Sequence, residues 1–387
     1  MSQKKYSLNE ADPIDDDAID EVIDDSIDDE ELFSFKPSDV KKEGEGEPTA
    51  DGLYEHFRFV ADRGQGPIRV DKFLVDRIVG TSRNRVQRAA DDGYIHVNGK
   101  PEKSSYKVKP CDVVTVMMDR PRHVLEILPE DIPLDIVYED DDLLVVNKPA
   151  GLVVHPGCGN YHGTLVNALA YHFKDDPKMK DMDDPRLGLV HRIDKETSGL
   201  LVVAKNEDAR TNLSLQFFKK TTRRQYVALV WGHIEENEGR IEGNIGRHPK
   251  DRLQMCVFPD GSQGKHAVTH FKVLERLGYV TAVRCVLETG RTHQIRVHMK
   301  HIGHTLFNDS RYGGDQILKG TTFAQYTQFV HKCFETCPRQ ALHAQTLGFR
   351  HPRTGEEMDF EAPIPQDMLD LFALWRDYIS NRYMKCS

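Results

Sequence analysis

The chain has 387 residues, of which 39% are hydrophobic, and this is enough to bury the cores of two or three domains. No apolar run approaches the roughly 20 residues that span a membrane, and the chain starts with acidic residues, so we expect a cytoplasmic protein without a membrane partner. Seven cysteines, an odd number scattered over a long chain, favour free thiols over a disulfide framework. The net charge of −10 is uneven, because residues 1–50 carry −12 and the remaining 337 residues carry +2, which leaves nucleic-acid partners open.

Residues 1–55 form an acidic segment that we predict to be a disordered tail. The sequence repeats Ile-Asp-Asp, at residues 14–16 and 23–25, and holds 17 acidic residues against 5 lysines in its first fifty positions. Charges of one sign repel each other, and too few large apolar side chains are present to form a core. A second interpretation stays open, in which the tail mimics RNA phosphates and competes for the protein's own basic surface until salt screens it.

Residues 68–118 are predicted to form a small compact unit. Apolar residues at helical spacing from Val70 to Ile78 predict a first helix, and Ser82 can cap a second one. The Asn98-Gly99 pair then predicts a β-hairpin. Basic side chains concentrate on the second helix and after the turn, where they contact RNA phosphates or form an ordinary solvated face. The residues that we assign to RNA contact in this unit are Arg83, Arg85, Arg88 and Lys100.

Residues 119–132 are predicted to be a linker, and residues 133–380 are predicted to be the larger domain. This domain alternates strand-like apolar runs with a few amphipathic helices. One helix is expected to begin with Asn206 as its cap, and the last is expected to run from Gln366 to about Tyr378. Because strands outnumber helices and do not alternate with them regularly, we expect an α+β fold with a mixed sheet.

The segment 188–204 is the most informative part of the chain. Two apolar runs of strand character bracket a short polar loop, His191-Arg192-Ile193-Asp194, and loops held between rigid strands often carry catalytic groups. Taken alone, this loop is equally consistent with a structural ion pair. Two further segments accompany it, Asn-Lys-Pro-Ala-Gly at 147–151 and Arg-Thr-His-Gln-Ile-Arg-Val-His at 291–298.

In this order, with the small basic unit in front, the three segments resemble the RluA/RluD-type pseudouridine synthases, from about Ile68 to about Tyr378. The basic unit resembles an S4-type RNA-binding domain. The resemblance implies a pseudouridine synthase fold, with a mixed, largely antiparallel central sheet flanked by helices and loops. It also implies an enzyme that breaks the N1–C1′ bond of a uridine in RNA, rotates the uracil and joins C5 to C1′. No cofactor and no metal are implied.

The same resemblance implies roles for four residues of the larger domain. Asp194 matches the family's catalytic aspartate, which either attacks the ribose or triggers an elimination, and Arg296 matches the arginine that pairs with it. Arg192 matches the residue that fills the gap left by the extruded nucleotide, and Tyr226 matches the tyrosine that packs on the uracil. Without the resemblance, Arg296 can simply support the sheet, and Tyr226 is a typical core residue. Ile193 replaces the commoner leucine and leaves every polar position intact.

Further basic residues of the larger domain are candidates for RNA contact. Lys148 belongs to the first motif and is assigned to the pocket or to a phosphate, whereas Pro149 and Gly151 suit a tight turn. Lys219 and Lys220 begin a basic run that continues to Arg224 and can contact the RNA backbone or form a solvated surface.

Two C-terminal segments bear on the choice of substrate. Residues 340–344 and 361–365 resemble the branch that modifies large-subunit (23S) ribosomal RNA, so we expect this RNA, or a ribosome-assembly intermediate, as the partner of a monomeric enzyme. Relatives with similar motifs modify tRNA or other ribosomal positions. Two other classes stay open: a noncatalytic RNA-binding or ribosome-assembly factor on the same fold, and a hydrolase that uses Ser198 or a metal bound by His298, His301 and His304.

Overall fold

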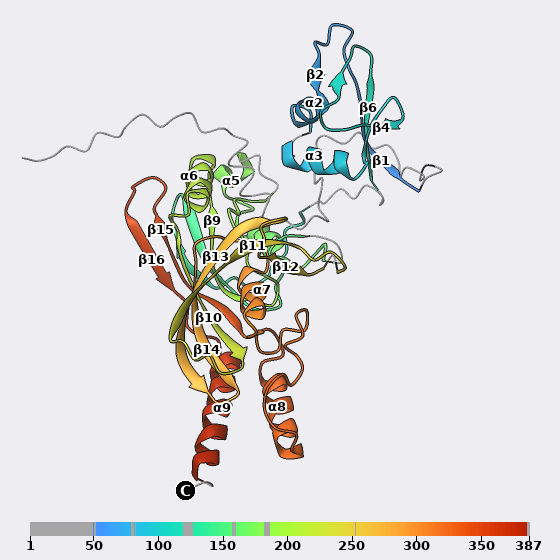
Figure 1. Cartoon of the computed structure of the whole chain (residues 1–387). Coiled ribbons are helices and arrows are strands. Elements are labelled where there is room, and N and C mark those ends of the chain that lie inside the picture. Colours follow the sequence, from blue (N-terminus) through green and yellow to red (C-terminus); the bar gives the residue numbers. More distant parts are fainter. Residues whose placement is uncertain are drawn as a thin grey trace, which may run out of the picture. The chain divides into compact units, whose positions relative to one another are not determined.

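A computed structural model describes Thr49 and residues 52–78, 81, 83–118, 127–156, 160–181, 186–251 and 253–384. The chain divides into two compact units, Met1–Glu126 and Ile127–Ser387, and each is described by itself (Figure 1). The predicted acidic tail lies almost entirely outside the described residues, as do residues 119–126 of the predicted linker. Within the described residues, no helix combines the length and the apolar character needed to cross a membrane.

In the part of the chain that the structure describes, the first unit is a four-stranded sheet with two helices. The sheet has the strand order β1-β6-β3-β4, and a separate pair joins β2 to β5. Strand β1 precedes the predicted start of this unit at Ile68 and pairs antiparallel along the length of β6. The elements are β1 (Tyr54–Val60), β2 (Ile68–Arg69), α2 (Val70–Val75), α3 (Arg83–Asp91), β3 (Ile95–Val97), β4 (Lys100–Pro101), β5 (Lys107–Val108) and β6 (Val113–Met118).

The local predictions for this unit are confirmed where the structure describes them. Val70, Phe73, Leu74 and Ile78 are buried together in the core of the unit, as their spacing predicts, but the helix ends at Val75, before Ile78. Asn98 and Gly99 have φ angles of 52° and 78° and turn β3 back into β4, as expected for a two-residue hairpin with both central residues left-handed. The predicted cap, Ser82, lies outside the described residues.

The second unit is built on a ten-stranded sheet with helices on both faces. The strand order is β12-β11-β13-β14-β10-β15-β9-β8-β7, and β16 pairs with β15 off this path. The named strands pair antiparallel except β9 with β15, which are parallel, so the predicted mixed, largely antiparallel sheet is confirmed. The strands are β7 (Ile136–Glu139), β8 (Leu143–Lys148), β9 (Ser198–Ala204), β10 (Arg223–Trp231), β11 (Glu238–Arg247), β12 (Met255–Phe258), β13 (Lys265–Leu277), β14 (Val280–Leu287), β15 (Leu342–Arg350) and β16 (Glu357–Glu361).

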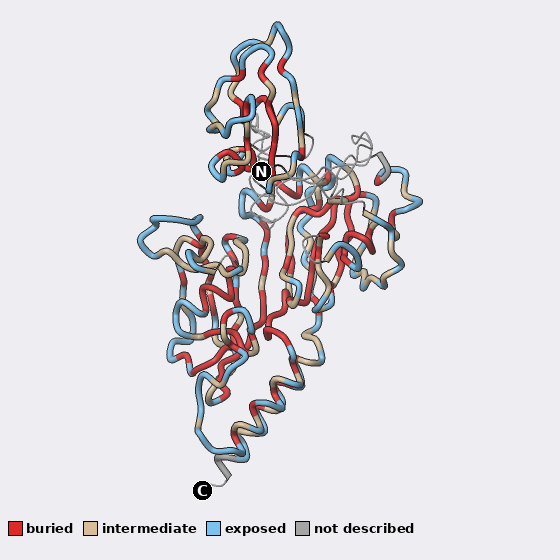
Figure 2. The backbone as a smooth tube through the Cα atoms, turned by 90° about the vertical axis from the view of Figure 1, so that its right-hand side faces the viewer, coloured by how far each residue is buried: buried red, intermediate tan, exposed pale blue. Residues whose placement is uncertain are grey.

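Two hydrophobic cores lie on the opposite faces of this sheet, because side chains alternate along a strand. On β10, Tyr226 and Ala228 belong to one core, and Val227 and Leu229 belong to the other. Figure 2 shows the buried residues concentrated in the strands between exposed loops. The first core includes residues of α4 (Leu165–His172) and α7 (Gln294–His301), and the second includes residues of α8 (Ala324–Thr336) and α9 (Gln366–Met384).

The helix expected after Asn206 is confirmed as α6 (Glu207–Phe218), and the Asn206 side chain accepts a hydrogen bond from the backbone N–H of Ala209. The last helix, α9, runs to Met384, past the predicted end near Tyr378. The first apolar run of the segment 188–204 was predicted to be strand-like, but it contributes only an isolated bridge between Leu189 and Val203.

Residues 127–132, which the sequence assigned to the linker, are hydrogen-bonded to the second unit. Asn167 of α4 donates its side-chain N–H to Leu128 O at 2.9 Å, and Asn167 O accepts from the backbone N–H of Glu130 at 3.0 Å. This part of the chain is therefore attached to the larger unit.

Gly199 marks a close approach of two backbones at the parallel pair of β9 and β15. Its φ is +121°, and a Cβ atom there would lie 2.2 Å from the carbonyl oxygen of Ala344. We expect Gly199→Ala to lower the free energy of unfolding by about 3 kcal/mol or more, because it adds a backbone clash to a strained φ. Gly303→Ala is the control, since Gly303 has φ +87° but open space around it, and we expect it to lose only about 1 kcal/mol. Urea unfolding of both variants measures the difference, and equal losses would contradict the clash.

Candidate active site

Asp194 and Arg296 meet although 102 positions separate them in the sequence. Arg296 lies on α7 and donates from Nη1 to Oδ2 of Asp194 at 2.8 Å. The Asp194 side chain keeps 19% of its surface exposed, whereas the Arg296 side chain is buried. The carboxylate is therefore held from the protein side and stays accessible from the other.

A second carboxylate orients Arg296. Asp309, which is fully buried, accepts from Arg296 Nε at 2.7 Å and from Nη2 at 2.9 Å, so that Nη1 is left for Asp194. Burial lowers the pKa of Arg296, but Asp194 and Asp309 outweigh burial and raise it above the usual arginine range. The sequence did not point to Asp309, because no local pattern distinguishes it from other aspartates near a turn.

Asp194 is ionised at neutral pH. Burial by itself would raise the pKa of this carboxyl, but the charges of His293 and Arg296 and the hydrogen bond from Arg296 hold the pKa well below its usual range. His293 Nε2 lies 3.9 Å from Asp194 Oδ1, and its Nδ1 is hydrogen-bonded to the Tyr312 hydroxyl at 2.7 Å. His293 belongs to the third motif, but the sequence assigned it no role.

Gln294 fixes the start of α7, and hence the position of Arg296. Its side-chain N–H group donates to Val268 O and to Thr269 Oγ1, both at 2.9 Å. Its oxygen accepts from Thr289 Oγ1 at 2.7 Å. Because these partners lie on β13 and just after the end of β14, the central sheet itself positions the arginine.

The predicted RNA contact of Lys148 is contradicted by its burial. Lys148 is fully buried, and its ammonium donates to the carbonyl oxygens of Pro149, Leu152 and Lys195 at 2.8, 2.8 and 2.9 Å. A side chain that is covered in this way cannot reach a phosphate. Since Lys195 follows Asp194 directly, Lys148 instead supports the loop that carries the carboxylate.

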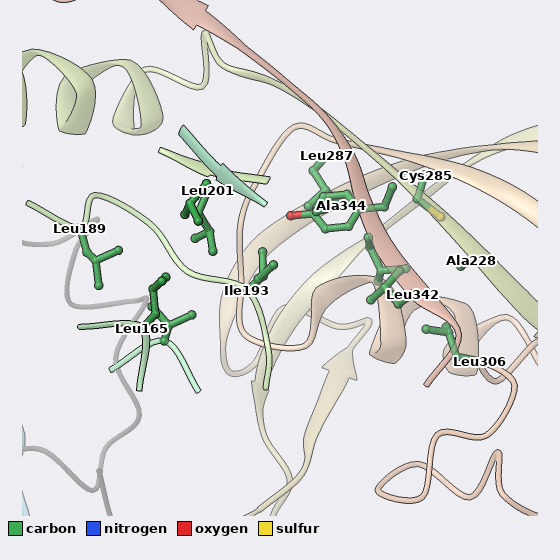
Figure 3. Packing of buried hydrophobic residues seen from close by; sticks show 14 of the residues in the cluster. Leu165, Leu189, Ile193, Leu201, Ala228, Cys285, Leu287, Leu306, Leu342 and Ala344 are labelled. Carbon is green, nitrogen blue, oxygen red and sulfur yellow. The ribbon is translucent and has the colours of Figure 1, made fainter. Parts of the chain in front are cut away.

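The other side of this loop is held by residues that the sequence analysis left without a role. Arg339 donates to Glu196 O at 3.1 Å and forms a bidentate pair with Asp367 of α9. Gln340 donates to Thr197 Oγ1 at 3.0 Å. The hydrophobic side chain of Ile193 completes the attachment, and Figure 3 shows it in the core that also contains Leu201 and Ala344.

Tyr226 lies on β10, on the face of the sheet that carries the first core, and only 8% of its surface is exposed. Burial raises the pKa of its hydroxyl, the Arg224 charge opposes this, and the charge of Asp194 adds to it. Tyr226 is thus both a core residue and a neighbour of the carboxylate. Arg192 is partly exposed, and its charge helps to lower the pKa of Asp194.

The basic residues assigned to RNA contact differ in exposure. Arg85 is 6% exposed, and Arg83 pairs with the buried Asp71 at 3.2 Å, so RNA contact by these two residues stays a prediction. The remaining four positions are on the surface of their units: Arg88, Lys100, Lys219 and Lys220.

The hydrolase interpretation does not fit the surroundings of Ser198. Ser198 is buried, and its hydroxyl is hydrogen-bonded to His343 Nδ1 at 2.9 Å, inside the protein. Its neighbours along the loop, His191 and Asp194, are engaged elsewhere, His191 by accepting from the backbone N–H of Val202. A serine nucleophile must be reachable by its substrate, and this one is not.

Two of the three histidines considered as metal ligands have separate partners. His298 is hydrogen-bonded to Thr269 Oγ1, and His304 to the carbonyl oxygen of Trp231. Among the described residues, Asp140, Asp142 and His351 do bring ligand atoms together.

The His351 ring is poorly suited to a metal, however. Its Nδ1 accepts from the backbone N–H groups of Arg353 and Thr354, which leaves the proton on Nε2, facing Asp140 at 2.9 Å. Arg353 Nε also lies 2.7 Å from Asp142. These contacts hold the turn at 351–354 against the turn at 140–142, and they do not leave the ligand atoms free for a cation.

Lys148 provides a test of the loop support. Burial lowers its pKa to about 7, and Asp194 and Glu196 oppose that shift. We expect Lys148→Met to reduce the free energy of unfolding at pH 7 by about 3 kcal/mol, because three buried carbonyl groups lose their donor.

The pH dependence of this difference has a definite sign. Between pH 7 and the ordinary lysine value near 10.4, unfolded Lys148 binds a proton that the folded form releases, so raising the pH stabilises the wild type relative to Lys148→Met, by at most about 1.4 kcal/mol per pH unit. Denaturant unfolding from pH 6 to 10 measures it, with Lys332→Met on the surface of α8 as the control for loss of a positive charge. A difference that does not change with pH would contradict the lowered pKa.

Comparison with known proteins agrees with this geometry. The model of the RNA pseudouridylate synthase family matches residues 142–301, and the model of the S4 domain matches residues 68–114. An RNA pseudouridine synthase of Chlorobaculum parvum is 47% identical over 305 residues, which are 79% of this chain and 93% of that protein. An RNA pseudouridine synthase of Bacillus subtilis is 48% identical over 311 residues, 80% of this chain and 95% of that protein.

A third relative carries a more specific description. The ribosomal large subunit pseudouridine synthase D of Neisseria meningitidis serogroup A is 44% identical over 308 residues, which are 80% of this chain and 79% of that protein. With identities above two fifths over most of each relative's length, this chain belongs to the RNA pseudouridine synthase family and is an RNA pseudouridine synthase with an S4 domain.

Proposed function

We propose that the enzyme converts uridines of large-subunit (23S) ribosomal RNA to pseudouridine, with Asp194 as the catalytic carboxylate. The observation that carries this proposal is the arrangement of Asp194, Arg296 and Asp309, in which an ionised carboxylate is fixed on one side and exposed on the other. The identity to a relative described as a large-subunit ribosomal synthase supports the choice of RNA.

The chemistry needs a carboxylate that is ionised without being fully hydrated. Asp194 meets this requirement because Arg296 and His293 stabilise its charge inside a largely buried loop. In one form of the mechanism the carboxylate attacks C1′, and in the other it triggers an elimination at the ribose. Both forms need the same ionised oxygen within reach of the sugar.

Two neighbours are assigned to the extruded nucleotide. The Tyr226 ring packs on the uracil, and stacking of this kind contributes roughly 1–3 kcal/mol per base. Arg192 occupies the gap that the uridine leaves, because a planar and permanently charged guanidinium can stack on bases and contact phosphates together. The charge of Arg192 lowers the pKa of Asp194, and the charge of Asp194 raises the pKa of Tyr226.

The remaining parts of the chain are assigned to RNA binding and its control. Residues 68–118 bind the RNA backbone through exposed residues such as Arg88 and Lys100, and Lys219 and Lys220 contact RNA next to the catalytic domain at 133–380. For residues 1–55, both interpretations stay open: a solvated disordered tail, and a tail that competes with RNA for these charges. We expect a cytoplasmic monomer that acts on ribosomal RNA or on a ribosome-assembly intermediate.

A noncatalytic RNA-binding factor is the rival explanation. Binding alone does not require a half-buried carboxylate that is paired with a buried arginine, itself held by a second carboxylate. A second alternative is a synthase with the same chemistry that acts on tRNA. Assays with ribosomal RNA and with tRNA distinguish this alternative from the proposed function.

Asp194→Asn tests the catalytic assignment. We expect it to reduce tritium release from large-subunit RNA labelled at uridine C5 by at least about 10⁴-fold, because the amide cannot supply the ionised oxygen. The affinity for RNA should stay within about threefold. Asp315→Asn, an exposed aspartate of the same domain, is the matched control and should release tritium at the wild-type rate. Full turnover by Asp194→Asn would refute the assignment. Tritium release from tRNA alone would show that tRNA is the substrate in place of ribosomal RNA.

The double variant Lys100→Gln/Lys103→Gln tests the role of the first unit. Both lysines are exposed, and the loss of two phosphate contacts should reduce the slope of log affinity against log salt by about 1–2. The single-turnover rate at saturating RNA should not change. Lys100→Arg/Lys103→Arg keeps the charges and serves as the control. An unchanged slope in the glutamine variant would remove these lysines from the RNA interface.

A further inference from the structure

Arg224 is a buried arginine without an ionic partner. It is 8% exposed, and its Nε is buried and makes no hydrogen bond. In the described part of the chain, no carboxylate forms an ion pair with it, whereas its neighbour Arg223 pairs with both Glu357 and Asp359. An isolated buried charge is strongly unfavourable, so such a residue indicates a negative charge that arrives with a ligand.

The surroundings of Arg224 hold it without neutralising it. Its guanidinium carbon lies 5.4 Å from the centre of the Phe217 ring, and Phe217 stacks on His191 with ring centres 4.4 Å apart. His191 is uncharged at neutral pH, because burial, and to a smaller extent the charge of Arg224, lower its pKa to about 3. A Cβ atom at Gly290 would lie 2.7 Å from Arg224 Nη1, so the backbone there can approach the guanidinium only because no side chain intervenes.

Arg224 lies on the same face of the sheet as the proposed uridine site. It precedes Tyr226 by two positions on β10, and residues two apart on a strand point to the same side. The charges of Arg224 and Asp194 both act on the Tyr226 hydroxyl, with opposite effects on its pKa. The tyrosine therefore has the carboxylate and the unpaired arginine as neighbours.

The reaction produces a negative charge that needs such a partner. When the N1–C1′ bond breaks, its electron pair leaves with the uracil and spreads over N1, O2 and O4, whether Asp194 attacks C1′ or triggers elimination. The C5–C1′ bond then forms. In the attack form, the Asp194–C1′ ester bond breaks as C5 bonds to C1′, and in the elimination form, Asp194 returns the proton that it took from the ribose. In both forms the Asp194 carboxylate is regenerated and the proton on C5 is lost to a base. Between these steps the negative charge has moved from the carboxylate to the detached base.

We propose that Arg224 is a further catalytic residue, which donates from its guanidinium to a carbonyl oxygen of the detached uracil and stabilises the charge on the base. This inference rests on the proposed function, because it assumes that the uridine is cleaved next to Asp194. Arg296 stabilises the charge where it starts, and Arg224 stabilises it where it arrives. Preorganised donors of this kind lower the barrier most when they are sheltered from water.

Arg224→Met removes the charge and keeps the length of the side chain. On the RNA that the wild type modifies, we expect the single-turnover rate constant at saturating RNA to fall by about 100-fold, with the dissociation constant within about threefold of wild type. Because an unpaired buried charge disappears, the melting temperature should not fall. Arg376→Met is the control: Arg376 is exposed on α9, it is already paired with Glu275, and its rate should be that of the wild type.

A better leaving group distinguishes this role from simple positioning. RNA with 5-fluorouridine at the target position releases a more stable anion, so the deficit of Arg224→Met should shrink by about tenfold or more. The readout is consumption of the intact 5-fluorouridine after digestion of the RNA. Arg224→Lys keeps the charge but loses the planar fork, and we expect a smaller deficit with the same dependence on the leaving group, so it carries the test if the methionine variant does not fold.

Three outcomes would overturn the inference. If Arg224→Met raises the dissociation constant for RNA and leaves the rate constant at saturating RNA unchanged, Arg224 is a phosphate contact. An equal deficit on both RNAs would make it a positioning residue. Full turnover by Arg224→Met would remove it from the site, while full turnover by Asp194→Asn in the same assay would instead overturn the proposed function.

Discussion

The chain of charges from Asp309 through Arg296 to Asp194 is the interaction on which the site depends. Arg296 is buried, and without Asp309 it would have one partner for a fork of five N–H groups. With Asp309 in place, the guanidinium can present only Nη1 to the loop, so the direction of the Asp194 carboxylate is set as well as its ionisation. Gln294 extends this control to the sheet, because it ties the first residue of α7 to β13.

The loop that carries Asp194 is held from opposite ends of the sequence. Lys148 reaches the carbonyl after Asp194 from β8, and Arg339 reaches the next carbonyl from the segment that precedes β15. Arg339 is in turn paired with Asp367 at the start of α9, so the last helix is connected to the loop by side chains. A catalytic group must be placed to within about 0.5 Å, and backbone contacts from several elements provide that precision where a free loop would not.

The parts that could be predicted from the sequence are those with a local signal. Helical spacing, the Asn98-Gly99 turn and the Asn206 cap each depend on neighbours a few residues away, and the structure contains all three. The burial of Lys148 and Arg85 could not be predicted, because a long basic side chain looks the same in sequence whether another element covers it or not. The role of Asp309 could not be predicted either, because only the tertiary fold brings it beside Arg296.

The two arginines beside Asp194 and Tyr226 show why pairing matters for function. Arg296 is neutralised before the substrate binds, so it can orient and ionise the carboxylate but has little attraction left for a new charge. Arg224 has no such partner in the described residues, and its burial destabilises the free enzyme. A negative charge that forms during the reaction relieves this unfavourable state, whereas a neutral uridine in the ground state does so only weakly. The arginine therefore acts on the charge-separated state more than on binding, which is the condition for lowering a barrier instead of tightening a complex.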